Sequence, residues 1–180
     1  MGFFCSQRCP GDIILHTYDL IRTLRDAGAP IIGGFHTAIE KDCLELLLRG
    51  KQPIVVCPAR SISNMRIPVT WAAAIETGRL LVLSPFGKVH GHITASLAEK
   101  RNRMVALMGE EFFVPHASPQ IQTERLCREI IAAGKKIYTF DSANNAHLIK
   151  SGFKPINTAY ELSQIKGSGQ FFLTCLPRLL

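Results

Sequence analysis

The sequence contains no hydrophobic run of the length that a membrane span requires. A transmembrane helix needs roughly 20 consecutive apolar residues, and no stretch of the 180 residues approaches that length. The N-terminus also lacks the basic region, the long apolar core and the cleavage site of a secretory leader. We therefore expect a soluble, cytoplasmic protein that makes no contact with a membrane.

Cysteine pairs of the kind that bind zinc are also absent. The six cysteines are spread through the sequence, and three residues separate Cys5 from Cys9 where zinc sites usually have two. No second cysteine pair accompanies them. Without a leader, the chain is expected to stay in a reducing compartment, so we expect free thiols and no bound metal.

Length and charge limit the remaining classes. A chain of 180 residues is long enough for one well-buried core and too short for two, so residues 1–180 are expected to form one domain. The formal net charge is +7. A positive balance of this size favours an anionic partner, whether nucleic acid, a nucleotide or phosphate.

Short apolar runs alternate with longer segments of helical periodicity. Strands are expected at residues 2–5, 30–32, 53–57, 80–83, 112–114 and 136–140. Helices are expected at 13–27, from Thr37 to about Gly50, at 68–77, from the segment containing Arg101 to Gly109, and at 121–133. This alternation predicts an α/β fold with a mainly parallel sheet of about six strands and helices on both faces.

Local signals mark several helix ends. Asp12 is expected to cap the first helix, and Thr37 with Glu40 forms a capping-box pattern at the start of the second. The end of the sequence is less regular. Residues 144–150 and 158–165 resemble short helices, and residues 171–173 are a candidate edge strand.

Small, basic and hydroxyl residues follow the expected strands. Open α/β sheets bind ligands at the carboxyl ends of their strands. These ends carry Arg8, Gly33, Gly34, His36, Arg60, Ser61, Ser84, His116 and Ser118. We therefore expect these residues to lie along one edge of the sheet and to form a site for phosphate or nucleic acid.

No single motif identifies that site. The Gly33–Gly34 turn can form a phosphate cradle, but the sequence has neither a complete G-x-G-x-x-G nor a G-x-x-x-x-G-K-[ST] motif, and turn geometry alone explains the glycine pair equally well. His36 and His116 each fit either an acid–base role or a satisfied polar residue at a strand end.

Arg101 interrupts the apolar face of a helix. It lies four residues after Leu97 and three before Met104, in the middle of the face that also carries Val105 and Met108. An unpaired charge in a core is very costly, so such an arginine meets either a structural partner or a bound anion. Both alternatives remain open from the sequence.

The segment around Arg101 resembles a known motif. "KRNRMVAL" is similar to the F-P-x-R-N-R-I-I-A-G-L motif of the Smf/DprA DNA-processing family, bacterial recombination mediators that bind single-stranded DNA. Further segments follow in the order of that family. "FFCSQRCP" resembles its V-G-S-R loop, "IIGGFHTAIEKDCLELLLRGKQPIVV" its S-G-x-x-x-G-I-D block, "GRLLVLSPF" its G-x-L-L-S-E strand, "FFVPHASPQIQT" its V-V-E-A segment and "NNAHLIKSGFKPI" its terminal N-x-L-I.

The resemblance implies a Rossmann-like three-layer fold and a basic pocket for single-stranded DNA. It assigns Arg101, Asn102 and Arg103 to that pocket. Independently of the resemblance, Lys100 and Arg103 lie three residues apart and add a basic flank to this helix. Two further matches are Arg8, at the arginine of V-G-S-R, and Gly34, at the glycine of S-G.

The sequence also departs from this family. Ala38-Ile39-Glu40 stands where the family has Gly-Ile-Asp, and Ser118-Pro119 replaces Ser-Gly. A wider superfamily includes phosphoribohydrolases with a P-G-G-x-G-T-x-x-E motif. The corresponding "PHASPQIQTER" has no glycine pair, and Glu124 follows Thr123 directly.

Single-stranded DNA binding in DNA processing is therefore the first functional hypothesis. The alternatives are a nucleotide-binding or nucleotide-cleaving member of the superfamily and a structural or interaction role. Ser84, Ser118 and the cysteines have no base partner visible in the sequence, so no catalytic residue is assigned and catalysis is not required. No cofactor is expected, and the sequence leaves open whether copies of the chain associate.

Overall fold

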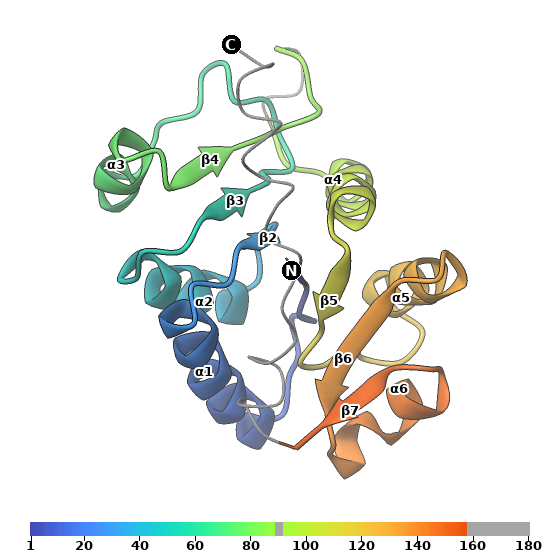
Figure 1. Ribbon diagram of the computed structural model, residues 1–180. Coiled ribbons are helices and arrows are strands. Elements are labelled where there is room, and N and C mark those ends of the chain that lie inside the picture. Colours follow the sequence, from blue (N-terminus) through green and yellow to red (C-terminus); the bar gives the residue numbers. More distant parts are fainter. Residues whose placement is uncertain (89–91, 158–180) are drawn as a thin grey trace.

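The computed structural model describes residues 1–88 and 92–157, which contain a sheet of seven parallel strands (Figure 1). The strand order is β4-β3-β2-β1-β5-β6-β7. The strands are β1 Gly2–Phe3, β2 Ile31–Gly33, β3 Ile54–Val56, β4 Leu80–Val82, β5 Glu111–Phe113, β6 Lys136–Phe140 and β7 Lys154–Ile156. The expected helix at 158–165 and the candidate strand at 171–173 lie outside the described residues.

Helices cover both faces of the sheet, as predicted (Figure 1). The helices are α1 Gly11–Asp26, α2 Ala38–Leu48, α3 Val69–Glu76, α4 Ala95–Met108, α5 Gln122–Ala132 and α6 Ala146–Lys150, with a short 3-10 helix, η1 Ala143–Asn145, before α6. The first three helices pack on one face, and α4, α5 and α6 pack on the other.

The core has two halves because successive strand side chains point to opposite faces. Phe3 and Phe113 pack with the side chains of α1 and α2. Their neighbours Phe4 and Phe112 pack with α4 and α5, and their rings stack at a centroid distance of 5.9 Å. Continuous apolar runs in the sequence therefore correspond to strands that are buried on both sides.

Most helix ends follow the local signals. Thr37 and Glu40 form the predicted capping box at the start of α2. The prediction that Asp12 caps α1 is wrong, because α1 begins at Gly11 after Pro10 and no side chain bonds at the cap position. Asp12 instead lies in the first turn, where its negative charge still favours the helix dipole.

The seventh strand, β7, was not anticipated as a strand. It consists of Lys154, Pro155 and Ile156, and only Ile156 is buried. Proline cannot donate to a strand ladder and is therefore found at sheet edges, where β7 lies. One buried residue in three gives no apolar run, so the sequence predicted about six strands.

The strand order reverses between β1 and β5. Strands β2, β3 and β4 extend the sheet on one side of β1, whereas β5, β6 and β7 extend it on the other. In open α/β sheets, the crevice at the carboxyl ends of the two strands that flank such a reversal is the usual ligand site. The loops that follow β1 and β5 are therefore the first place to look for function.

Two further features concern the membrane and the cysteines. No helix in the described part of the chain is both long and apolar enough to cross a membrane. Cys5, Cys9, Cys43, Cys57 and Cys127 are free thiols, and all of them except Cys9 are buried.

Candidate functional site

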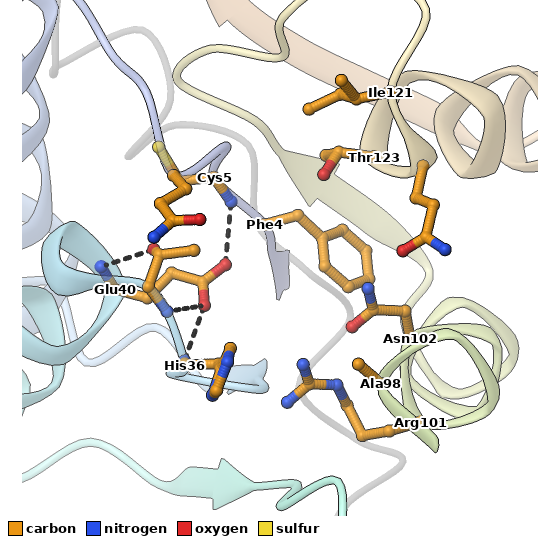
Figure 2. A pocket seen from close by; sticks show the side chains of 12 residues that line it. Phe4, Cys5, His36, Glu40, Ala98, Arg101, Asn102, Ile121 and Thr123 are labelled. Atoms are coloured by element: carbon orange, nitrogen blue, oxygen red, sulfur yellow. Dashed lines mark hydrogen bonds between the residues drawn. The ribbon is translucent and has the colours of Figure 1, made fainter. Parts of the chain in front are cut away.

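A cavity of about 290 Å³ lies beside the carboxyl end of β1, among α2, α4 and α5 (Figure 2). Its walls come from the β1 loop, the start of α2, the inner face of α4 and the start of α5. They are formed by Phe4, Cys5, Gln7, His36, Thr37, Glu40, Ala98, Arg101, Asn102, Ile121, Gln122 and Thr123. The cavity therefore lies next to the reversal of strand order.

Arg101 is the main cation of this cavity. It lies on the buried face of α4 with Leu97 and Val105, and its side chain is only 4% exposed. Met108, which was expected on the same face, is 40% exposed. The Arg101 guanidinium extends from α4 toward the wall formed by His36 and Glu40 (Figure 2).

The hydrogen bonds of Arg101 are incomplete. Its Nη1 donates to the carbonyl oxygen of Cys57 at 2.8 Å, and its enclosed Nε has no hydrogen-bond partner among residues 1–88 and 92–157. No carboxylate in the described part of the chain lies within ion-pair distance of the guanidinium. Burial lowers the pKa of Arg101, and the charge of Glu40 opposes that shift. Within the residues that the structure describes, Arg101 thus has one carbonyl partner and no ion pair.

Gly34 makes room for this arginine. A Cβ at position 34 would collide with Nη1 and Cζ of Arg101. Gly34 is not among the glycines with positive φ, so its backbone conformation is open to other residues. The glycine therefore leaves room for the close approach of the guanidinium, and a side chain at this position would force the end of Arg101 to shift.

Glu40 closes the opposite wall. Its Oε1 accepts from the amide of Cys5 at 2.9 Å, and its Oε2 accepts from the amides of His36 at 2.7 Å and Thr37 at 3.2 Å. Phe35 has φ of 46°, in the left-handed region, directly before these two amides. Such conformations are costly for a bulky residue and persist where the surroundings hold them, here beside a candidate site.

The start of α5 forms the third wall. Residues Ile121, Gln122 and Thr123 line the cavity. The first hydrogen bond within α5 is donated by Arg125, so the amides of Gln122 and Thr123 have no partner in the described part of the chain. Unpaired amides at a helix start favour an anion.

Three of the predicted site residues line the cavity directly: His36, Arg101 and Asn102. Gly34 abuts the guanidinium, and Gly33 is the last residue of β2. His36 lies just before α2, and Arg101 and Asn102 lie on α4, so the three residues belong to two different walls.

The other predicted residues lie around the same edge but outside the cavity lining. Near the reversal of strand order, the Ser118 hydroxyl donates to the Arg8 carbonyl oxygen at 3.5 Å. Near β3 and β4, the Ser84 hydroxyl donates to the Arg60 carbonyl oxygen at 2.6 Å, and Ser61 is buried beside them. Because all seven strands are parallel, the expectation that these strand ends share one edge is confirmed.

Lys100 and Arg103 lie on the exposed surface of α4. Arg103 bonds Glu99 and Glu129, each at 3.3 Å, so the Glu99–Arg103 pair expected from helical spacing is present. Arg103 borders a separate apolar groove between α4 and α5. The two arginines of the motif therefore serve different surfaces.

His116 is a satisfied polar residue. Its Nδ1 lies 2.8 Å from Oδ1 of Asn145, and both side chains are buried. His116 is absent from the cavity lining. Of the two interpretations of this histidine, the structural one fits the geometry.

Some residues of the cavity were not anticipated as site residues. Glu40 was expected only as a helix cap, and Gln122 and Thr123 lie in the segment "FFVPHASPQIQT" without a predicted role. The signal for the latter two lay in the helix start itself, which faces the edge where ligands bind. Among residues 1–88 and 92–157, no group of three or more His, Cys, Asp or Glu side chains could hold a metal ion.

Comparisons with known proteins give matches in structure alone. No family model matches the sequence, and no curated protein matches it. DNA processing protein A (DprA) from Streptococcus pneumoniae has a TM-score of 0.73 and 15% identity, covering 91% of this chain and 60% of that chain. This chain thus spans less than two thirds of that protein.

Two further structures share the fold. DNA processing protein A from Helicobacter pylori, described for its single-stranded DNA binding mode, has a TM-score of 0.70 and 17% identity, covering 91% of this chain and 77% of that one. The molybdenum cofactor carrier protein MCP from Chlamydomonas reinhardtii has a TM-score of 0.62 and 9% identity, covering 92% of this chain and 98% of that one. The chain therefore has the Rossmann-type fold of DprA, as the sequence resemblance implied.

Proposed function

We propose that this chain binds single-stranded DNA and holds one backbone phosphate in the cavity at the carboxyl edge of the sheet. The observation that carries the proposal is Arg101, a guanidinium that is almost fully buried, lines the cavity and has no carboxylate partner among residues 1–88 and 92–157. A buried charge without a counter-ion is costly, and a bound phosphate supplies the missing anion.

The surroundings of Arg101 support this choice of ligand. The unpaired amides of Gln122 and Thr123 favour a negative group at the start of α5. Asn102 and His36 add side chains that can bond a phosphate or a base. The net charge of +7 favours the approach of a polyanion.

The wider edge offers a path for the rest of the strand. From the cavity toward β4, a bound strand would pass Arg60, Ser61 and Ser84. Toward β5 it would pass Arg8 and Ser118. We assign these residues to the rim of the interface, where they would bond phosphates without reading sequence. The fold shared with the single-stranded-DNA-binding protein from Helicobacter pylori supports the assignment as an analogy.

Arg101→Lys tests the proposal. Lysine keeps the positive charge but loses the planar group that binds phosphate through two N–H groups. We expect weaker binding of a labelled oligothymidine, measured by fluorescence anisotropy. For Arg101→Ala, we expect the slope of log affinity against log salt to fall by about 0.7, the value for one phosphate on a single strand.

Arg103→Ala is the matched control, since Arg103 lies on the same helix outside the cavity and is paired with two carboxylates. We expect at most a small effect on affinity. Equal losses in the Arg103→Ala and Arg101→Ala variants would move the interface to the outer surface of α4, and unchanged affinity in a folded Arg101→Ala protein would refute the proposal.

A second candidate function is the binding of a nucleotide or a phosphate-bearing cofactor. Its support is the cavity volume of about 290 Å³, close to the lower end for small-molecule sites, and the nearly complete coverage of the carrier protein MCP. Saturable binding of a mononucleotide with no affinity for oligothymidine would favour this candidate.

Nucleotide cleavage has less support than binding. Glu124 is the acid nearest the expected position, and its carboxylate accepts from the amide of Gln120 at 2.7 Å and from Arg128 at 3.0 Å. Both of its oxygens are therefore engaged in holding the start of α5. Measurable release of base from a nucleoside monophosphate would restore the enzymatic interpretation.

A further inference from the structure

Glu40 does more than cap a helix. Its carboxylate accepts hydrogen bonds from three backbone amides, one in the β1 loop and two in the β2 loop, and the residue is 5% exposed. The bond to Cys5 joins residues that are 35 positions apart in the sequence. One side chain thus ties the loops after two neighbouring strands together (Figure 2).

The three amides that donate hydrogen bonds to Glu40 form an anion site. Loop amides beside the N-terminus of a helix are the groups that cradle phosphates in many α/β proteins. Here those of Cys5, His36 and Thr37 are already bonded to a carboxylate of the same chain. The Glu40 carboxylate of the same chain therefore occupies the anion site next to the Gly33–Gly34 turn.

Among the described residues, the cavity lining carries one charged side chain of each sign. Among its lining residues, Arg101 supplies one positive charge and Glu40 one negative charge. The two groups are not within ion-pair distance of each other in the described part of the chain. A ligand with one negative charge meets the guanidinium. Every additional negative charge faces the carboxylate, because no second lysine or arginine of residues 1–88 and 92–157 lines the cavity.

We propose that Glu40 sets the specificity of the cavity, which admits the singly charged phosphodiester of a DNA strand and disfavours diphosphates and terminal phosphates. This inference rests on the proposed function. A terminal phosphate carries about −1.5 to −2 charges at pH 7, and a diphosphate carries more. Repulsion by a resident carboxylate is a standard way to reject such a ligand.

The test begins with the wild-type protein. A thymidine dinucleotide, which has one phosphodiester, and thymidine 5′-diphosphate are compared as competitors of a labelled oligothymidine. A basic protein without this device would prefer the more highly charged diphosphate. We expect wild type to prefer the dinucleotide by at least tenfold, and a preference for the diphosphate would overturn the inference.

The second arm uses Glu40→Gln, which removes the charge and keeps one amide-accepting oxygen. We expect the ratio of dinucleotide to diphosphate affinity to fall at least tenfold, equivalent to about 1.4 kcal/mol. A ratio within one sample is independent of the folded fraction, so lost stability cannot mimic this result. An unchanged ratio would assign Glu40 a structural role only.

Glu45→Gln is the matched control. It makes the same chemical change on α2 at an exposed residue outside the cavity lining. We expect its affinity ratio to equal that of wild type, and a shift like that of Glu40→Gln would attribute the effect to the overall charge of α2. Failure of the wild type to bind any oligothymidine would refute the proposed function itself, whatever the ratio.

Discussion

Replacing Gly34 by alanine displaces Arg101 without changing it. The new Cβ would collide with Nη1 and Cζ of the guanidinium and lie 2.7 Å from its Nη2. Position 34 does not have the positive φ that restricts it to glycine. The side chain of Arg101 must therefore move, and the bond from its Nη1 to the Cys57 carbonyl oxygen, 2.8 Å in the native protein, must break.

The expected cost is moderate. A buried hydrogen bond from a charged group contributes about 1.5–3 kcal/mol. Alanine recovers about 0.4–1 kcal/mol by restricting the unfolded chain. Gly34→Ala should therefore destabilise the protein by about 0.5–2.5 kcal/mol, which lowers the Tm of a domain of this size by about 1–10 °C.

A double-mutant cycle isolates the cause. Gly34→Ala is made in wild type and in an Arg101→Ala background, and the free energy of unfolding is measured by urea denaturation. Without the guanidinium the added methyl has no obstacle, so in that background we expect Gly34→Ala to be neutral or slightly stabilising. The coupling between the two sites should be about 1.5–3 kcal/mol.

Gly11→Ala provides the control for backbone effects. A Cβ at position 11 meets no atom within 4 Å, and Gly11 has no positive φ. It should leave stability unchanged or slightly raised. Additive effects of Gly34→Ala and Arg101→Ala would show that the clash does not govern the position of the arginine, and the argument for its fixed geometry would fail. The same Gly34→Ala protein should also bind oligothymidine about 10–100-fold more weakly, because its guanidinium no longer faces the cavity.

Three further outcomes are expected. Asn145 is fully buried and makes four side-chain hydrogen bonds, so Asn145→Ala should lower the free energy of unfolding by about 3 kcal/mol in urea titrations. The hydrogen bond from the Gln120 amide lowers the pKa of Glu124 below its usual 4.5. The ionised Glu124 therefore stabilises the folded protein above pH 4.5, and this stabilisation is lost as the pH falls through the folded pKa. Between pH 7 and about pH 3, the free energy of unfolding of Glu124→Gln should therefore fall less than that of wild type. Burial raises the pKa of Cys127 to about 12, whereas a hydrogen bond from Cys5 lowers the pKa of the half-buried Cys9. The thiolate is the form that reacts, so alkylation of the native protein followed by mass spectrometry should find Cys9 modified first and Cys127 unmodified.

The architecture was accessible from sequence because its signals are local and strong. Strands that are buried on both faces have unbroken runs of apolar residues in the sequence. Gly28, Gly78 and Gly134 adopt left-handed backbone conformations at helix ends. Strand β7 lacks such a signal. Its pairing with β6 is a tertiary interaction, visible only once the neighbouring strand is in place.

The site was only partly accessible for a related reason. Arg101 could be identified because a charge at i+4 from Leu97 and i−4 from Val105 interrupts a helical period. Glu40 gave no such signal, since its spacing from Thr37 is fully explained by a capping box. Its bond to Cys5 depends on how the β1 and β2 loops meet, and no local pattern encodes that contact.

Arg101 and Arg103 illustrate what a motif resemblance leaves undecided. The family motif assigns both arginines to one pocket, but residues two apart on a helix are separated by about 200° and cannot face the same way. Arg101 points inward to the cavity, and Arg103 pairs with Glu99 and Glu129 on the outer surface. A strand crossing that surface would bring its phosphates toward two carboxylates, whereas a phosphate entering the cavity would meet a guanidinium that has no ion pair in the described part of the chain. The electrostatics of α4 therefore favour its inner face as the main contact and leave Arg103 as a prediction for the rim.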